Sequence, residues 1–257
     1  MTDPTVSVFV KGCREQIHWL CYCLQFLEKN WAQWKDGDNV VMLDPNCAEI
    51  VKDWGIQNVR YGFEEPWPDR YMHALYMKAI ADTYCHGDII LLVDSDTMLF
   101  RPASVTQFMM EGRLNLQFLP WEMERDAGQK VAMELWPRVV KESTGLDLPV
   151  DYMVARPWLF WRSTFSGARE LVENHKQDLF YDAVYSEAEF DWHNYPNHPF
   201  TFCDLENLGL YAAGAEPEKY WITDYREHAV PEFFADIWSH TPFTPLLQQK
   251  LDKLLKE

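Results

Sequence analysis

The sequence predicts an α/β fold in which helices cover the faces of a parallel sheet. Over about the first 100 residues, short β-branched or aliphatic runs alternate with segments of helical periodicity, which is the pattern of βαβ units. The clearest strand signal is the aliphatic run Ile89–Val93, which directly follows the turn-forming pair Gly87-Asp88. Ligands of such sheets bind beyond the carboxyl ends of the strands, so the residues after this run are the first place to look for chemistry.

Each half of the chain contributes its own set of expected elements. In the first half we expect strands at 6–10, 40–43, 57–61 and 89–93, a helix at 17–27, and a helix that Asp69 caps and that runs to about Tyr84. In the second half we expect helices at 128–141, 163–176 and 205–213, an irregular stretch between about 181 and 202, and a C-terminal amphipathic helix with Thr244 as its cap and Pro245 in its first turn.

Composition excludes several protein classes. The chain has 257 residues, of which 47% are hydrophobic, and this content excludes a disordered chain. The run Ile89–Val93 is far shorter than the roughly 20 residues of a membrane helix, and the start Met1–Pro4 lacks a signal-peptide pattern. We therefore expect a cytoplasmic protein. The net charge of −17 weighs against a large nucleic-acid footprint, and the six cysteines lack a CxxC spacing and are predicted to be reduced thiols.

Two carboxylates follow the central strand in the stretch Val93–Thr97. In extended backbone, residues two apart point the same way, so Asp94 and Asp96 would lie on one side at the ligand-binding edge. Two carboxylates at such a short separation repel each other unless a cation or a proton lies between them. A divalent metal ion that prefers oxygen ligands could bind to both. The alternative is that these are only turn residues that end a strand.

A fuller pattern around this stretch resembles the GT-A fold of nucleotide-sugar glycosyltransferases, and in particular a bacterial and viral branch of that group. The residues that carry the resemblance are Tyr76, Lys78 and Asp82, the run Gly87–Thr97, Arg101-Pro102, the opening Val8–Lys11, the helix around Trp19, Tyr22 and Leu24, and the later segment Phe202–Tyr211. The resemblance implies a mixed, mainly parallel sheet flanked by helices. It also implies one domain over 1–257, with a nucleotide-sugar-binding half at 1–110 and an irregular acceptor-side half at 111–257.

The resemblance implies a metal site. Asp96 would bind Mn²⁺ or Mg²⁺ directly, and Asp94 would bind the metal or the donor ribose. A later histidine often completes such a site, and His240 is the candidate in this chain. The alternative for His240 is a surface or structural histidine.

Donor contacts are assigned in the same way. Lys11 and Arg14 follow the first strand, where GT-A proteins seat the nucleotide, and Ser95 lies between the two acids. Lys78 could reach a donor phosphate or base, with Asp82 beside it. The alternatives are solvated charges after the first strand and an i,i+4 surface pair between Lys78 and Asp82.

Asp204 and Glu206, at the start of an expected helix, are the candidate catalytic carboxylates. An inverting transferase needs a carboxylate that deprotonates the acceptor hydroxyl, whereas a retaining enzyme needs electrostatic help at the donor sugar. A helix cap is the alternative for Asp204. The aromatic and amide-rich segment Asp191–His198 could line an acceptor pocket or form a packed loop. Trp158 and Trp161 are open to the same two interpretations.

The sequence therefore predicts a metal-dependent glycosyltransferase, either hexosyl or pentosyl, that moves a sugar from a nucleoside-diphosphate sugar to an acceptor hydroxyl. A glycan is the expected acceptor, and a modified base in viral DNA is the lesser alternative. A DxD-type phosphatase is a competing interpretation, although Met98 stands where its pattern has Thr or Val. A nucleotidyltransferase is a second competing interpretation, although such enzymes usually have a glycine-rich phosphate loop after the first strand, where this chain has a single glycine, Gly12. A non-catalytic binding module is the third.

Overall fold

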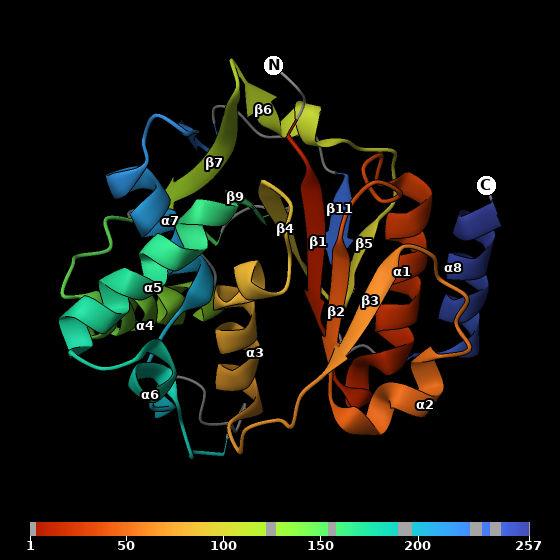
Figure 1. Cartoon of the computed structure of the whole chain (residues 1–257), viewed down its shortest axis with the longest axis horizontal. Coiled ribbons are helices and arrows are strands. Elements are labelled where there is room, and N and C mark those ends of the chain that lie inside the picture. The colour runs from red at the N-terminus through yellow and green to blue at the C-terminus, as the bar shows by residue number, and fades with distance from the viewer. Residues whose placement is uncertain are drawn as a thin grey trace. The chain divides into compact units, whose positions relative to one another are not determined.

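The computed structural model describes residues 4–121, 127–153, 158–189, 197–226, 233–236 and 243–256, with the backbone alone for 127–133 and 235–236 (Figure 1). The chain divides into two compact units. Unit 1 comprises Met1–Glu65, Tyr84–Phe108 and Val230–Glu257, and unit 2 comprises Pro66–Thr83 and Met109–Ala229. The predicted boundary near residue 110 is a division of function, and it stays a prediction.

Unit 1 contains a parallel sheet with the strand order β3-β2-β1-β4. Its strands are β1 (Val6–Lys11), β2 (Asn39–Leu43), β3 (Val59–Phe63) and β4 (Ile89–Asp94), and a separate antiparallel pair joins β5 (Thr97–Leu99) to β11 (Phe234–Asp236). Its helices are α1 (Ile17–Asn30), α2 (Ala48–Val51) and α8 (Pro245–Lys256), with 3₁₀ turns at Arg14–Gln16, Pro45–Cys47 and Val105–Phe108. A mainly parallel sheet flanked by helices confirms the predicted α/β class.

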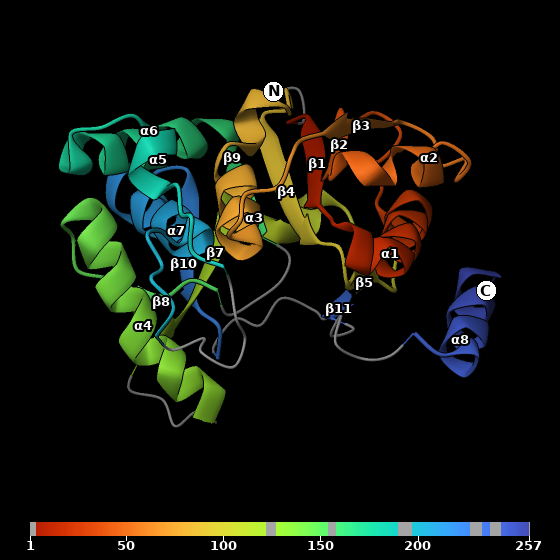
Figure 2. The same ribbon diagram turned by 90° about the horizontal axis from the view of Figure 1, so that it is seen from below.

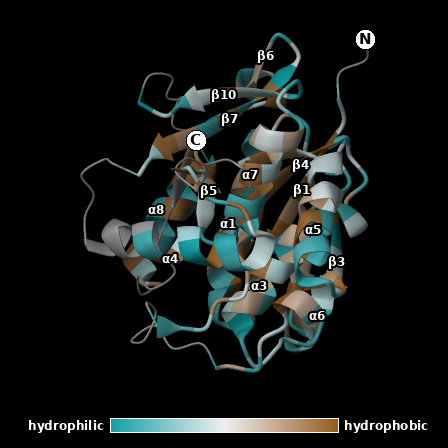
Figure 3. Cartoon of the chain, turned by 90° about the vertical axis from the view of Figure 1, so that its left-hand side faces the viewer, coloured by the Kyte–Doolittle hydropathy of each residue, from teal (hydrophilic) through white to brown (hydrophobic). Residues whose placement is uncertain are grey.

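The core of unit 1 lies along β1, β4 and the inner face of α1. Every residue of β1 and β4 is buried except the last of each, and both strands are hydrophobic along most of their length (Figure 3). Leu20, Leu24 and Leu27 recur at helical spacing in α1 and are fully buried. The aliphatic run that predicted β4 is therefore the centre of this unit, and it fixes where its polar end lies.

The C-terminal helix α8 packs beside α1 (Figure 1). Its predicted cap is confirmed, because the Thr244 Oγ1 atom accepts a hydrogen bond of 3.2 Å from the Leu247 amide. The Tyr22 hydroxyl donates to Asp252 Oδ1 over 2.5 Å, and the Lys29 ammonium donates to the Leu254 carbonyl over 2.9 Å. A cation at the last turn is favourable, since that end of a helix carries partial negative charge.

Unit 2 is built on strand β7, which pairs in parallel with β10 and antiparallel with β6 and β8. Its strands are β6 (Met109–Met110), β7 (Arg113–Pro120), β8 (Val150–Asp151), β9 (Trp158–Trp161) and β10 (Tyr220–Asp224). Its helices are α3 (Arg70–Ala79), α4 (Ala127–Thr144), α5 (Arg162–Lys176), α6 (Phe180–Val184) and α7 (Asp204–Ala215), with a 3₁₀ turn at Ala81–Thr83. Helices α4, α5 and α7 pack on one another (Figure 2).

Several predicted boundaries need correction. Asp69 caps α3 as expected, by accepting from the Met72 amide over 2.9 Å, but the helix ends at Ala79 instead of continuing to Tyr84. The third strand lies two residues later than predicted, at Val59–Phe63. The second half is also more regular than expected, since it holds five strands among the described residues, and α6 lies in the stretch expected to be irregular.

Two other expectations concern the whole chain. All six cysteines are free thiols, as predicted, and four of them are buried. None of the described helices combines the length and the apolar character that a membrane crossing requires. The cytoplasmic location stays a prediction.

Candidate functional site

The polar residues of unit 1 gather where its parallel strands end. Lys11 is the last residue of β1, Asp44 comes directly after β2, and Asp94 is the last residue of β4. Lys11 and Asp94 are register partners across the β1–β4 pair. Because the strands are parallel, these ends share one edge of the sheet, the edge at which α/β proteins bind ligands.

The predicted carboxylate pair occupies a tight turn at this edge. Strand β4 ends at Asp94, Ser95 and Asp96 form the turn, and β5 begins at Thr97. Asp94 and Asp96 are half-buried, whereas Ser95 is only 3% exposed. The extended backbone predicted for this stretch is wrong, because Ser95 and Asp96 form a turn, so the common side of the two carboxylates stays a prediction.

Helix α1 contacts this turn from the protein interior. The Ser95 hydroxyl donates a 2.6 Å hydrogen bond to Gln16 Oε1, and the Cys23 thiol lies 3.7 Å from the Asp94 carbonyl oxygen. Burial raises the pKa of the Cys23 thiol well above its usual value, and the negative charges of Asp96 and Asp94 raise it further. Both carboxylates therefore act electrostatically on the same buried sulfur.

Lys11 and Asp44 form a buried ion pair beside the turn. The Lys11 ammonium lies 3.1 Å from Asp44 Oδ1, and both side chains are less than one-tenth exposed. The second carboxylate oxygen of Asp44 is buried and has no hydrogen-bond partner among the described residues. Arg14 is exposed, and its guanidinium donates to the Asn46 carbonyl over 2.9 Å.

Asp44 directly follows the expected strand at 40–43, and it is not among the predicted site residues. The signal that identifies it is the one that identified Asp94, namely an acid directly after a buried apolar strand. Its pairing with Lys11, 33 positions away, was not readable from the sequence.

In unit 2 the structure brings Lys78 and Asp204 together. The Lys78 ammonium lies 3.9 Å from Asp204 Oδ2 and 5.4 Å from the ring centre of Trp158, a cation–π arrangement. Asp204 is fully buried, and the Lys78 side chain is 12% exposed. Cys203 is the N-cap of α7, so Asp204 does not cap the helix, but it lies in the first turn, where an acid is favourable.

The second predicted catalytic acid, Glu206, is also fully buried. Its Oε2 atom accepts a 3.0 Å hydrogen bond from the Tyr152 amide. Burial raises the pKa of Glu206 well above its usual value of 4.5, and the neighbouring carboxylate of Asp151, with which it shares a hydrogen bond, raises it further. Glu206 therefore retains its proton over a wider pH range than an exposed glutamate does, and Asp151 is a neighbour that sequence reasoning missed.

Asp82 does not have the partner that the surface-pair alternative gave it. Because α3 ends at Ala79, Asp82 lies beyond the helix and does not form the i,i+4 pair with Lys78. Its carboxylate instead makes a bidentate pair with the guanidinium of Arg169 on α5, which also donates to the Ala79 carbonyl over 2.8 Å. This arrangement joins α5 to the end of α3.

Part of the predicted site lies outside the described residues. His240 is among these positions, as is 191–196 of the segment that was expected to line an acceptor pocket. His198, at the end of that segment, is 4% exposed, and its Nε2 lies 2.6 Å from Asp69 Oδ2. Trp158 is buried and Trp161 half-buried. Within the described ranges, no group of three or more His, Cys, Asp or Glu side chains is arranged to hold a metal ion.

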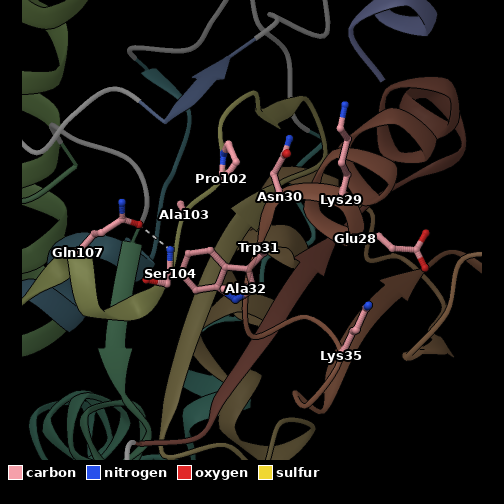
Figure 4. A pocket seen from close by; sticks show the side chains of 10 residues that line it. All are labelled: Glu28, Lys29, Asn30, Trp31, Ala32, Lys35, Pro102, Ala103, Ser104 and Gln107. Atoms are coloured by element: carbon pink, nitrogen blue, oxygen red, sulfur yellow. Dashed lines mark hydrogen bonds between the residues drawn. The ribbon is translucent and has the colours of Figure 1, made fainter. Parts of the chain in front are cut away.

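A surface pocket of about 620 Å³ lies elsewhere in unit 1 (Figure 4). Its lining includes Lys29, Trp31 and Lys35 near the end of α1 and Ser104 and Gln107 from the segment after β5. None of the predicted site residues contributes to it, so it does not bear on the chemistry of the Asp94–Asp96 turn.

No protein-family model matches the chain. No curated protein matches it either. Among solved structures, it is similar to the galactosyltransferase LgtC crystallised with donor and acceptor sugar analogues, with 13% identity, a TM-score of 0.48, and coverage of 97% of this chain and 95% of that one. The glycosyltransferase GlyE of Streptococcus pneumoniae is similar at 10% identity and a TM-score of 0.42, over 88% of this chain and 47% of that one. At these scores the likeness supports no conclusion about function.

Proposed function

We propose that this chain transfers a sugar from a nucleoside-diphosphate sugar to an acceptor hydroxyl, with Mn²⁺ or Mg²⁺ bound at the Asp94–Asp96 turn. The observation that carries the proposal is the placement of two half-buried carboxylates directly beyond a buried parallel strand. Their place in a sequence pattern that resembles GT-A glycosyltransferases supports sugar transfer over other chemistry of this edge.

The residues of the turn fit a hard divalent cation. Carboxylate oxygens are the ligands that Mg²⁺ and Mn²⁺ prefer, and Asp94 and Asp96 offer carboxylates from one short turn. A bound cation would neutralise charge on the departing nucleoside diphosphate. Two side chains are fewer than a full octahedral set requires, so phosphate oxygens and water would supply the remaining ligands.

The basic residues near the turn differ in what they can offer a donor. Lys11 is buried against Asp44, so we propose that it orients the Asp44 carboxylate at the edge of the sheet where the nucleotide would bind. Arg14 is exposed and can reach phosphate oxygens. The Ser95 hydroxyl donates to Gln16 and its side chain is almost fully buried, so we propose only the Ser95 backbone for a donor contact.

The two predicted catalytic acids of unit 2, Asp204 and Glu206, lie beside different charged groups. Burial and the neighbouring Asp151 carboxylate raise the pKa of Glu206 and favour its protonated form, so we do not assign the base role to it. We assign that role to Asp204, with Lys78 as its charge partner. Asp204→Asn should then lower transfer to the acceptor and leave slow hydrolysis of the donor in place.

The direct test is a screen of nucleoside-diphosphate sugars against the full chain, with and without Mn²⁺, for release of free nucleoside diphosphate. We expect one donor to be hydrolysed slowly in the presence of Mn²⁺, and faster when a suitable acceptor is added. Release of pyrophosphate from nucleoside triphosphates would instead identify a nucleotidyltransferase. Hydrolysis of a simple aryl phosphate would identify a phosphatase. Either result would contradict the proposal.

A glycan is the acceptor that we propose. The net charge of −17 opposes binding to a phosphate backbone, which ranks a modified base in DNA below it. A panel of oligosaccharide acceptors, scored by mass increase of one sugar unit, distinguishes hexosyl from pentosyl transfer in the same measurement.

A further inference from the structure

The side chain between the two acids is anchored to helix α1. The Ser95 hydroxyl donates to Gln16 Oε1 over 2.6 Å, although the two residues are 79 positions apart in the sequence. Ser95 is 3% exposed and Gln16 is half-buried, so the bond is partly shielded from solvent. A short hydrogen bond at a buried turn fixes the orientation of the backbone around it.

A second group on the same helix contacts the same turn. The Cys23 thiol lies 3.7 Å from the Asp94 carbonyl oxygen. Gln16 stands at the N-cap position of α1, and Cys23 follows it by seven residues, about two helical turns, so both side chains leave the same face. One face of α1 therefore holds the turn at two points, the backbone of Asp94 and the side chain of Ser95.

Neither of these contacts uses a carboxylate oxygen. Gln16 and Cys23 engage the hydroxyl of Ser95 and the backbone of Asp94, and neither of these two contacts involves the carboxylate of Asp94 or Asp96. The helix itself does not require the Gln16 side chain, since that side chain makes no capping hydrogen bond to α1. The role of Gln16 is thus directed at the turn and not at its own helix.

We propose that Gln16 is a positioning residue, which through Ser95 holds the Asp94–Asp96 turn in the conformation that binds a divalent cation. This inference rests on the metal site of the proposed function. Contacts that orient metal ligands from behind typically change metal affinity by about 10- to 100-fold when they are removed. An effect of that size on Mn²⁺ binding is therefore expected from the loss of this one hydrogen bond.

The test measures Mn²⁺ binding to the full chain by the electron paramagnetic resonance signal of free Mn²⁺, without any substrate. Gln16→Met keeps the size of the side chain and removes the acceptor oxygen, and Ser95→Ala removes the donor. We expect each variant to bind Mn²⁺ about 10-fold more weakly than the wild type. The double variant should bind no more weakly than either single one, because both changes break the same bond.

Two further variants separate positioning from general damage. Gln16→Glu keeps an acceptor oxygen at this place and should retain wild-type affinity or exceed it. Gln33→Met is the matched control, since the Gln33 side chain also accepts one hydrogen bond, from the Val105 amide over 3.1 Å, but it does so away from the turn. It should bind Mn²⁺ as the wild type does. If Gln16→Met is poorly folded by circular dichroism, the comparison of Ser95→Ala with Gln33→Met decides the question.

The possible results assign failure to different claims. If the wild type does not bind Mn²⁺, the metal site of the proposed function is wrong, and the role of Gln16 falls with it. If the wild type binds Mn²⁺ and the Gln16→Met and Ser95→Ala variants bind it equally well, only the positioning role is wrong. If the two losses add in the double variant, the residues act separately, and the proposed coupling through one bond is also wrong.

Discussion

Lys11 and Asp44 meet across adjacent strand ends, with 3.1 Å between the Lys11 ammonium and Asp44 Oδ1. Both side chains are almost fully buried, and one Asp44 oxygen has no hydrogen-bond partner among the described residues. Removing two charges from water is costly, and their mutual attraction offsets that cost only while both are present. The pair is therefore expected to be sensitive to the loss of either member.

The first prediction concerns this pair. Lys11→Met should lower the free energy of unfolding by about 3 kcal/mol, because it leaves the Asp44 carboxylate buried without its cation. The double variant Lys11→Met/Asp44→Asn should regain most of the lost stability. Urea unfolding followed by circular dichroism measures both, and a double variant that is as unstable as the sum of the single ones would contradict the account.

The second prediction concerns the pH dependence of stability. The pKa of Glu206 is raised in the folded state, so between its usual value of 4.5 and the raised value the folded chain binds more protons than the unfolded chain. The contribution of Glu206 to the free energy of unfolding is then fully present below about pH 4.5, and it is lost as the pH rises through the pKa that Glu206 has in the folded state. Glu206→Gln, which mimics the protonated acid, should flatten this decline.

The matched control for Glu206 is the exposed residue Glu170 of the same unit. Urea unfolding over a range of pH should give the same slope for Glu170→Gln as for the wild type. An unchanged slope in Glu206→Gln would mean that the buried carboxyl does not carry the effect.

The third prediction compares two glycines of α7. A Cβ atom at Gly209 would overlap the side chain of Tyr152, which is itself buried, whereas a Cβ atom at Gly214 would meet nothing within 4 Å. Gly209→Ala should cost about 1–3 kcal/mol through overpacking. Gly214→Ala should be neutral or stabilise the protein by about 0.5 kcal/mol. Thermal unfolding of the two variants checks the contrast, and equal melting temperatures would refute it.

Much of the fold of unit 1 follows from its sequence because burial leaves a continuous signal there. The aliphatic runs of β1, β2 and β4 are buried on both faces, and the helical spacing of Leu20, Leu24 and Leu27 marks the inner side of α1. The end of α3 was less predictable. No Gly or Pro directly follows Ala79 to end the helix. Just beyond its end, Asp82 forms an ion pair with Arg169, which lies 87 positions later in the sequence.

The strands of unit 2 carried a weaker signal. Strand β7 alternates buried Leu114 and Leu116 with half-buried neighbours, but this alternation covers only the first half of the strand and gives a weak signal. Strand β8 of unit 2, like β5 and β11 of unit 1, has only two or three residues, too few for any period to show. Their existence depends on pairing with distant segments, which a local reading of the sequence does not provide.

The candidate site shows the same division. Local spacing predicted the Asp94–Asp96 pair, because both acids follow one strong strand. The partners that set the chemistry come from far away, as Gln16 does for Ser95, Asp204 for Lys78 and Asp151 for Glu206. Sequence reasoning named Lys78 and Asp204 separately but not their pairing, and it missed Gln16 and Asp151.

The most direct measurement of the central claim is nucleoside-diphosphate release by the Asp96→Asn variant, in the presence of Mn²⁺ and the donor that the wild type uses. The exposed residue Asp53 supplies the control, as Asp53→Asn removes the same charge from the surface of the same unit. The account predicts that Asp96→Asn folds normally and loses metal-dependent release, while Asp53→Asn behaves as the wild type. Wild-type release by a folded Asp96→Asn variant would contradict it.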